Sequence, residues 1–340
     1  MSSVLVSVVV PTYNGARRIG ACLGALSQQS ASHAAEVLVV NDGSTDDTAQ
    51  VVLRFPEVRL INQANAGPAA ARNRGAQEAR GRFLLFTDDD CVPTPDWLEA
   101  MLAAFQDDEV VGAKGAYRTR QPELVARFVQ MEYEDRYRMM GRIRDIDFVD
   151  TYSAAYVRER FLEMNGYDTS FPLACAEDVD LSYRMSAQGW KMRFQPGAVV
   201  YHSHPNTLTC YLKKKYKFAF WRVLAVRNNP VKMVKDSHTP QMMKLQLLFL
   251  PVLLLSAAYD LVSRRALLAP MAVIVAFVLS TLPFVIRTCR KDLLLALLSP
   301  LLLAARASAQ VIGVASGMIN ARRSAAAHIK QTHCLRPANK

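Results

Sequence analysis

Short, continuous apolar runs alternate with polar, turn-forming segments over the first ninety residues of the chain. These runs occupy residues 4–10, 36–40, 58–61 and 83–86. Unbroken runs of this length, rich in Val, Ile, Leu and Phe, are typical of strands buried on both faces of a parallel sheet. Helical spacing appears between them, as in Ile19, Leu23 and Leu26. The pattern therefore predicts an α/β fold in which helices flank a mostly parallel sheet.

Polar residues follow directly where several of these predicted strands end. Pro11–Gly15 follows the first strand, Asn41–Thr48 the second, and the triplet Asp88-Asp89-Asp90 the fourth. Because parallel strands end at one edge of a sheet, these segments are expected to meet there, where α/β folds bind ligands. Three adjacent carboxylates suit a hard cation, Mg²⁺ or Mn²⁺. A solvated turn that caps the next helix would explain the triplet equally well.

A different pattern governs the last hundred residues. Residues 245–262 carry a single charge, Asp260, and residues 266–286 carry none, so both are long enough and apolar enough to span a bilayer. A third segment, 293–318, is apolar at its start but contains Arg306, which leaves a third span and an interfacial helix as alternatives. Two spans would keep most Lys and Arg residues on the side of the N-terminal domain.

The charge of the chain points in the same direction. The formal net charge is +11, and the basic residues gather after about position 200. Residues 211–222 interleave lysines with Tyr, Phe and Trp, which suits a helix at an anionic bilayer surface. No nucleic-acid-reading motif is visible. The expected domains are 1–206 (catalytic), 207–244 (basic linker), 245–320 (membrane helices) and 321–340 (basic tail).

Compartment signals are consistent with this organisation. The N-terminus lacks a basic segment followed by a signal-like apolar run, so we expect the N-terminal domain to stay in the cytosol, at the inner or plasma membrane. The six cysteines are scattered and show no C-x-x-C pair, which favours reduced thiols over a zinc site or a disulfide framework.

Four spaced motifs make a family resemblance specific. They are Val8–Asn14, Val40–Asp46, Ala71–Gly75 (Ala-Arg-Asn-Arg-Gly) and Thr87–Asp90. In this order they resemble the signature blocks of the family 2 inverting glycosyltransferases, over roughly residues 4–210. The resemblance implies the GT-A fold, a Rossmann-like sheet flanked by helices, followed here by an α-helical membrane region.

The resemblance also implies roles for the residues that follow the strands. Pro11, Thr12, Tyr13 and Asn14 would line the nucleotide pocket, Asp42 would accept a hydrogen bond from the base, and Arg72 would face the ribose or phosphates. Asp88 and Asp90 would be the acids of the D-x-D motif. Asp90 is expected on the metal, Asp88 toward both ribose and metal, and Asp89 near the nucleotide.

Two later blocks complete the resemblance. Glu177-Asp178-Val179-Asp180-Leu181 resembles the family's E-D-x-D-L block at a helix start, in which Asp178 would be the general base. Plain N-terminal helix acids are the alternative. Asp180 is expected to pair with Arg184 one turn later, and Glu177 and Trp190 are expected on the acceptor side. His202, rather than His204, is expected to join the metal.

These observations predict a membrane-anchored glycosyltransferase of the hexosyltransferase type. It would move a sugar from a nucleotide-sugar donor, expected to be UDP-linked, to a hydroxyl of a lipid-linked or surface-glycan acceptor. Mg²⁺ or Mn²⁺ would assist. A processive polysaccharide synthase is an alternative, although its Q-x-x-R-W motif is absent; a non-catalytic nucleotide-binding membrane scaffold is another. A dehydrogenase is disfavoured because no G-x-G-x-x-G follows a strand.

Overall fold

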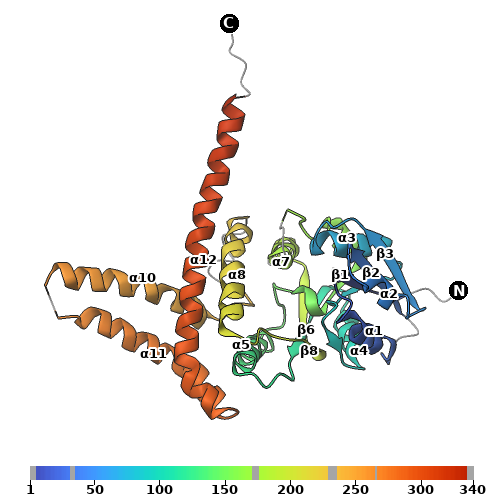
Figure 1. The fold of residues 1–340 in the computed structure, drawn as a ribbon. Coiled ribbons are helices and arrows are strands. Elements are labelled where there is room, and N and C mark those ends of the chain that lie inside the picture. Colours follow the sequence, from blue (N-terminus) through green and yellow to red (C-terminus); the bar gives the residue numbers. More distant parts are fainter. Residues whose placement is uncertain (1–4, 31–34, 171–175, 229–235, 265, 335–340) are drawn as a thin grey trace, which may run out of the picture. The chain divides into compact units, whose positions relative to one another are not determined.

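The computed structural model describes residues 5–30, 35–170, 176–228, 236–264 and 266–334 (Figure 1). The chain forms two compact units. The first contains residues 1–206 and 236–240, and the second contains residues 207–235 and 241–340. The tail beyond residue 334 lies outside the described residues. Each unit is described separately below.

The first unit is built around a mixed sheet whose first half is parallel. Its first four strands are β1 (Val6–Thr12), β2 (Ala35–Asp42), β3 (Val58–Gln63) and β4 (Phe83–Phe86). They lie in the order β3-β2-β1-β4, and every neighbouring pair is parallel. The four strands predicted from the apolar runs are confirmed, and the polar segments after β1, β2 and β4 lie at one edge of the sheet.

The second half of the sheet changes direction twice. Its strands are β5 (Val92–Pro93), β6 (Val110–Arg118), β7 (Ala154–Val157) and β8 (Lys191–Tyr201). β7 is antiparallel to β4, β6 is antiparallel to β7, and β8 is parallel to β6. The two reversals restore the original direction, so β8 ends at the same edge as β4. β5 closes that side of the sheet, antiparallel to β8.

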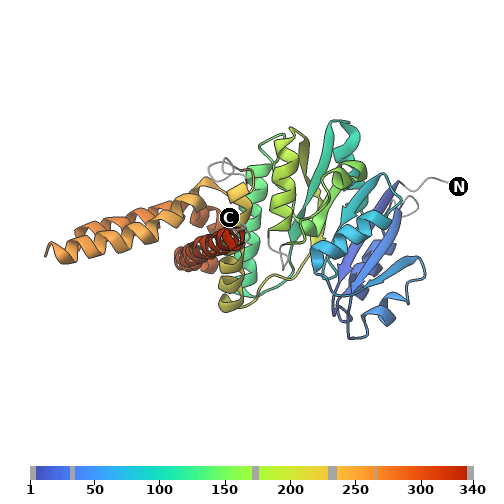
Figure 2. The ribbon, with the colours of Figure 1, turned by 90° about the horizontal axis from the view of Figure 1, so that it is seen from above.

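Helices cover both faces of this sheet (Figure 2). They are α1 (Ile19–Ser27), α2 (Thr48–Val52), α3 (Pro68–Glu78), α4 (Trp97–Leu102), α5 (Leu124–Met140), α6 (Arg158–Glu163) and α7 (Glu177–Ala187), with short 3₁₀ turns at Ala103–Gln106 and Thr151–Ser153. Alternate residues of β1 point to opposite faces. Val9 faces α3, where a Cβ added to Gly75 would lie 2.3 Å from its Cγ1, so only glycine allows this close approach.

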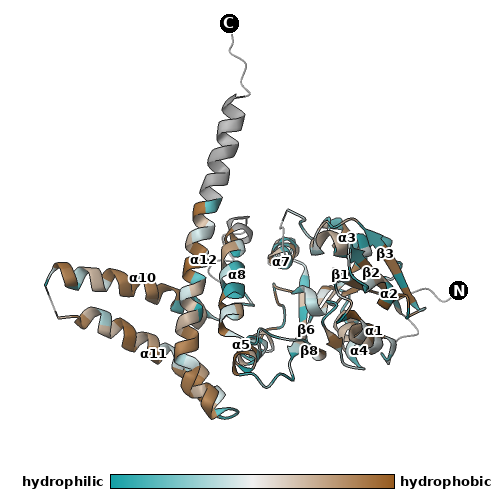
Figure 3. Cartoon of the chain, in the orientation of Figure 1, coloured by the Kyte–Doolittle hydropathy of each residue, from teal (hydrophilic) through white to brown (hydrophobic). Residues whose placement is uncertain are grey.

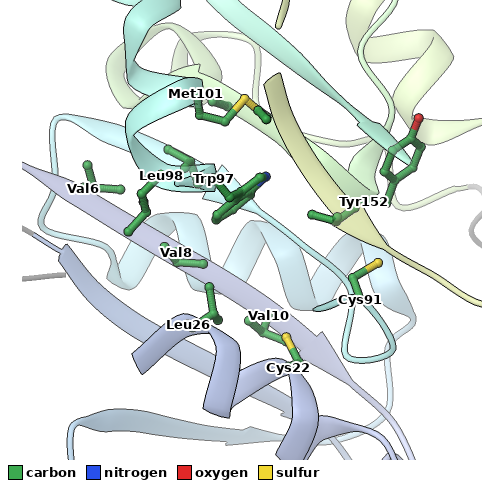
Figure 4. Close-up of a cluster of buried hydrophobic side chains, with 14 of the residues drawn as sticks. Val6, Val8, Val10, Cys22, Leu26, Cys91, Trp97, Leu98, Met101 and Tyr152 are labelled. Carbon is green, nitrogen blue, oxygen red and sulfur yellow. The ribbon is translucent and has the colours of Figure 1, made fainter. Parts of the chain in front are cut away.

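The opposite residues of β1 belong to the largest apolar core. Val6, Val8 and Val10 pack with side chains of α1 and α4, among which Trp97 and Met101 are fully buried (Figure 4). Trp97 also donates its indole N–H to Ser153 Oγ at 2.8 Å, so its one polar atom is satisfied. The core therefore fixes α4 directly after the acidic segment that follows β4.

Two details of the first unit differ from simple expectation. Glu132 and Arg136, two charged side chains of α5, are buried rather than exposed. Residues 236–240 rejoin the first unit after α8: Asp147 accepts hydrogen bonds from the Ser237 N–H (2.7 Å) and hydroxyl (2.5 Å), and the rings of His238 and Phe148 are in contact. This short segment carries no apolar or motif signal in the sequence.

The second unit is helical and strongly apolar (Figure 3). It contains α8 (Leu208–Asn228), α10 (Gln241–Val262), α11 (Leu268–Cys289) and α12 (Leu293–Cys334). Three segments are long and apolar enough to cross a membrane: Gln241–Val262, Leu268–Cys289 and Leu293–Asn320. α10 and α11 form a hairpin that crosses α12 rather than running alongside it (Figures 1 and 2).

α12 packs closely against α8 along the second half of its described length. A Cβ added to Gly313 would lie 2.5 Å from the carbonyl oxygen of Tyr216, and one added to Gly317 would lie 2.5 Å from that of Phe220. The two glycines are one helical turn apart, so together they let the backbones of α8 and α12 approach. Where the hairpin crosses α12, the Gln246 side chain is buried. Its amide N–H donates a hydrogen bond to Ser280 Oγ, and its amide oxygen accepts one from Arg306.

Candidate active site

Arg72 is the centre of a polar cluster at the edge of the sheet where β1, β2, β4 and β8 end. Its side chain is 2% exposed, donates to Asp88 Oδ1 at 2.7 Å and lies 3.2 Å from Glu177 Oε1. Burial lowers the pKa of Arg72, but the charges of Asp88 and Glu177 more than reverse this. One guanidinium therefore joins the end of β4 to the start of α7. In the structure Arg72 faces two of the protein's own carboxylates, and its expected contact with the ribose or phosphates stays a prediction.

The three acids after β4 have different environments. The side chains of Asp88 and Asp90 are 29% and 35% exposed, whereas that of Asp89 is 9% exposed. Asp89 accepts a 2.6 Å hydrogen bond from Thr12 Oγ1 and pairs with Arg18 at 3.1 Å. Burial raises the pKa of Asp89, and its bonds to Arg18 and Thr12 oppose this. Asp89 thus braces the end of β1, and its expected place near the nucleotide stays a prediction.

The segment after β1 is connected to the segment after β2. The Asn14 carboxamide oxygen accepts from the Thr45 N–H at 2.8 Å, and the Asn14 N–H donates to Ser44 Oγ at 2.9 Å. Close by, a Cβ on Gly15 would lie 2.3 Å from Asp89 Oδ2, so the chain passes directly over the buried acid. Pro11 is buried in β1, and Tyr13 is 49% exposed, which leaves its ring available to a ligand.

Asp42 lies at the end of β2 and is buried. Its Oδ1 accepts from Gln63 Nε2 (2.7 Å) and the Ala66 N–H (2.9 Å), and its Oδ2 accepts from the Gly67 N–H (2.8 Å). The carboxylate therefore shapes the loop that leads into α3. Its predicted contact with a nucleotide base stays a prediction.

Asp90 and His202 lie side by side, as expected for metal ligands. His202 follows β8, and its Nδ1 lies 3.2 Å from Asp90 Oδ1. Two neighbouring ligands, each about 2.1 Å from one ion, are separated by about 3.0–3.4 Å, so this pair fits a divalent cation. Among the described residues that could hold a metal, Cys91 completes this group, and Asp88 is paired with Arg72 instead. His204 is buried 3.0 Å from Gln130 Oε1.

Asp178 opens α7, and its surroundings disfavour its charge. Burial is the main cause, followed by the negative charges of Glu177 and Asp150, and together they raise the pKa of Asp178 to about 8. The Val179 N–H donates to its Oδ1 at 2.7 Å and the nearby Arg72 charge also opposes this rise. A carboxylate with a raised pKa at the edge of a site is suited to proton transfer.

Two other residues of the E-D-x-D block hold the helix in place. The Glu177 side chain is 2% exposed and forms an ion pair with Arg72. Asp180 pairs with Arg184 at 2.7 Å, as predicted. Trp190 lies beyond the opposite end of α7, about 14 Å along the helix from Asp178, and its ring lies against Arg160. The structure therefore does not bring Trp190 to this cluster.

Three further groups escaped the sequence analysis. Asn73 clamps the loop at Tyr167 by accepting from its N–H (2.9 Å) and donating to its C=O (2.8 Å). Lys114 is 1% exposed and forms a buried ion pair with Asp150, whose neighbour Val149 is joined to α7 through Ser182. Asn73 lies within the Ala71–Gly75 motif, which could have signalled it. Lys114 lies in an apolar run and Asp150 in a charged segment, and neither segment carries a recognisable motif.

The fold agrees with the comparisons to known proteins. Residues 7–163 match the family model described as Glycosyl transferase family 2, so the chain carries a domain of this family. The predicted GT-A fold is also shown. The mannosyltransferase PcManGT from Pyrobaculum calidifontis, solved with GDP-Man and Mn²⁺, superimposes with a TM-score of 0.61 at 21% identity, covering 92% of this chain and 86% of that chain.

Curated relatives match over shorter stretches. The glycosyltransferase EpsJ of Bacillus subtilis is 32% identical over 221 residues, 60% of this chain and 63% of that protein. The validoxylamine A glucosyltransferase of Streptomyces hygroscopicus subsp. jinggangensis is 30% identical over 222 residues, 55% of this chain and 53% of that protein. The chain thus spans between half and two-thirds of the length of these two relatives.

Replacing Arg72 by alanine should lower the free energy of unfolding of the domain far more than replacing Arg74 in the same helix. Arg72→Ala leaves the buried Glu177 charge without its guanidinium, which typically costs about 3–5 kcal/mol. Arg74 is 52% exposed and forms an exposed pair with Glu78, so Arg74→Ala should cost less than about 1 kcal/mol. Urea unfolding of both variants measures the difference; equal midpoints would contradict the central role of Arg72.

Asp178→Asn should stabilise the protein at alkaline pH. Because the folded-state pKa of Asp178 is raised, its contribution is present below the unfolded pKa, near 4, and is lost as pH rises through about 8. Removing the charge should regain on the order of 1–3 kcal/mol at pH 9, discounted for partial exposure, and about 2–10 °C in melting temperature. The gain should vanish at pH 4; a pH-independent difference would contradict the assignment.

Proposed function

We propose that the protein is a membrane-anchored glycosyltransferase that moves a sugar from a nucleotide-sugar donor to an acceptor hydroxyl with inversion. The observation that carries this proposal is the double contact of Arg72 with Asp88 and Glu177. It unites the acidic segment after β4 with the segment that presents Asp178, although about ninety positions separate them in sequence. A donor-binding acid and a proton acceptor thereby share one site.

Asp178 would act as the general base. Its carboxylate accepts the proton of the acceptor hydroxyl while that oxygen attacks the anomeric carbon and the nucleoside diphosphate leaves from the opposite side. A single displacement of this kind inverts the configuration of the sugar. The raised pKa of Asp178, about 8, makes the carboxylate a stronger base than an ordinary aspartate. General-base assistance typically contributes about 10²–10⁴ in rate.

The donor is proposed to lie along the ends of β1, β2 and β4. Tyr13 is exposed beside the Asn14–Thr45 contact, and the loop held by Asp42 forms the neighbouring wall for a base, which we take to be uracil. Asp90 and His202 would hold a divalent cation, Mg²⁺ or Mn²⁺, which when bound offsets the charge of the diphosphate. PcManGT, which shares the fold, was solved with a nucleotide sugar and Mn²⁺.

The acceptor is proposed to be a lipid-linked sugar or a growing surface glycan, because apolar helices that can cross a bilayer follow the catalytic domain. Two of the three would span: α10 and α11, as a hairpin. α12 is packed on α8 through Gly313 and Gly317, and α8 exposes Lys213, Lys214 and Lys217. A spanning α12 would draw these lysines into hydrocarbon, at a cost of about 2.5–3.5 kcal/mol each.

Loss of the general base should separate transfer from donor binding. Asp178→Asn should lower the turnover of a nucleotide-sugar donor by about 10²-fold or more while leaving its dissociation constant within about threefold. Asp108→Asn, an exposed carboxylate far from the cluster in the fold, is the matched control and should behave like the wild type. Unchanged turnover in Asp178→Asn would overturn the base assignment.

The wild-type pH profile provides a second reading of the same residue. Turnover should rise with pH through about 8, because only deprotonated Asp178 accepts the proton, and then level off.

A donor panel of UDP-, GDP- and dTDP-sugars, followed by nucleotide release with and without Mn²⁺, identifies the nucleobase and the sugar of the donor. If UDP-, GDP- and dTDP-sugars all release their nucleotide equally well, the proposed recognition of the nucleobase by the Asp42 loop would be contradicted.

The membrane topology is tested with tags at both ends of the chain. With α10 and α11 as the two spans, N-terminal and C-terminal epitope tags lie on the same side of the membrane and respond alike to a membrane-impermeant protease. Three spans would place the tags on opposite sides. A tag in the α10–α11 turn, after Arg264, is the internal control, because it lies across the membrane in either case.

A further inference from the structure

The thiol of Cys91 faces the same point as the two expected metal ligands. Cys91 directly follows Asp90 and is fully buried. Its Sγ lies 3.8 Å from Asp90 Oδ1 and 3.9 Å from His202 Nδ1, while these two atoms are 3.2 Å apart. One oxygen, one nitrogen and one sulfur donor thus form a triangle whose members all lie within 4.8 Å of one another.

The dimensions of this triangle match three ligands of one ion. Zinc lies about 2.3 Å from a cysteine sulfur, about 2.0–2.1 Å from a histidine nitrogen and about 2.0–2.2 Å from a carboxylate oxygen. At tetrahedral angles, such ligands are about 3.4–3.6 Å apart, which is within a few tenths of an ångström of each of the three separations. The fourth position would remain open to water or to a phosphate oxygen.

We propose that Asp90, Cys91 and His202 form a three-donor site that prefers a thiophilic divalent cation such as Zn²⁺ or Co²⁺ over Mg²⁺. Sulfur binds borderline and soft ions well and Mg²⁺ poorly, so a site with a thiolate ligand discriminates by ligand type as well as by size. Binding replaces the thiol S–H bond by a sulfur–metal bond, and the proton is released to solvent. The inference rests on the metal site of the proposed function, but not on the transfer reaction.

The simpler role of a buried cysteine is that of a small apolar residue whose S–H donates weakly to a neighbour. Cys22 illustrates that role in the same domain. It is also fully buried, and its Sγ lies 3.6 Å from the backbone oxygen of Asp88. Cys22 is not part of any metal-holding group among the described residues, so it is the matched control for a thiol without ligand geometry.

Ligation by Cys91 would change how the enzyme responds to metals. A thiophilic ion would be retained at concentrations at which Mg²⁺ is only partly bound, and divalent affinities rise from Mn²⁺ through Co²⁺ in any such site. Zn²⁺ would therefore compete with the hard cation for Asp90 and His202. The identity of the bound metal would follow the metal supply as well as the donor.

Cobalt titration of the detergent-solubilised full-length protein tests the inference directly. Co²⁺ is expected to give the near-ultraviolet sulfur-to-cobalt charge-transfer band and to release one proton per ion, both read without any turnover. Cys91→Ser should lose the band and weaken Co²⁺ binding about tenfold or more, with a smaller loss for Mn²⁺. Cys22→Ser should keep the band and the affinity.

The outcomes separate this inference from the proposed function. Co²⁺ binding without a sulfur band would overturn ligation by Cys91 and leave the Asp90–His202 site intact. A band that survives in Cys91→Ser would also overturn it. Absence of any divalent-ion binding by the wild type would remove the metal from the proposed function as well. If Cys91→Ser fails to fold, the wild-type spectrum and its loss in Asp90→Asn decide.

Discussion

The buried guanidinium of Arg72 is the constraint on which the site depends. An arginine that is 2% exposed can be tolerated only if carboxylates surround it, and here the two come from segments far apart in sequence. The planar fork serves both at once, which a lysine could not do with the same geometry. The rest of the arrangement follows: α3 must approach β1 closely enough to deliver Arg72, and Gly75 makes that approach possible.

The same charge balance explains why one acid is suited to chemistry and its neighbours are not. Glu177 and Asp89 each pair with an arginine. Asp178 is instead destabilised in its charged form, mainly by burial and further by two acidic neighbours. The folded protein is therefore less stable with Asp178 charged than with Asp178 neutral. Such a cost is typical of active sites, where local stability is given up for reactivity.

Much of this domain is predictable from the sequence, because it depends on local patterns. The apolar runs located the parallel strands, and the polar segments after them located the edge at which the candidate site lies. The direction of individual side chains was not predictable. Whether Arg72 and Asp89 point outward or inward depends on partners such as Glu177 and Arg18, which only the tertiary structure brings near. The pairing of Cys91 with His202 likewise follows from tertiary structure, because β5 pairs antiparallel with β8 and places Val92 opposite Tyr201.

The segment 236–240 has a consequence for how the chain is held together. Because Ser237 and His238 are fastened to Asp147 and Phe148, the excursion through α8 begins and ends on the same folded body. A single cut between residues 207 and 235 would therefore leave two fragments that stay associated. The helices that follow residue 240 would then be joined to the first unit through these non-covalent contacts alone, without a continuous backbone.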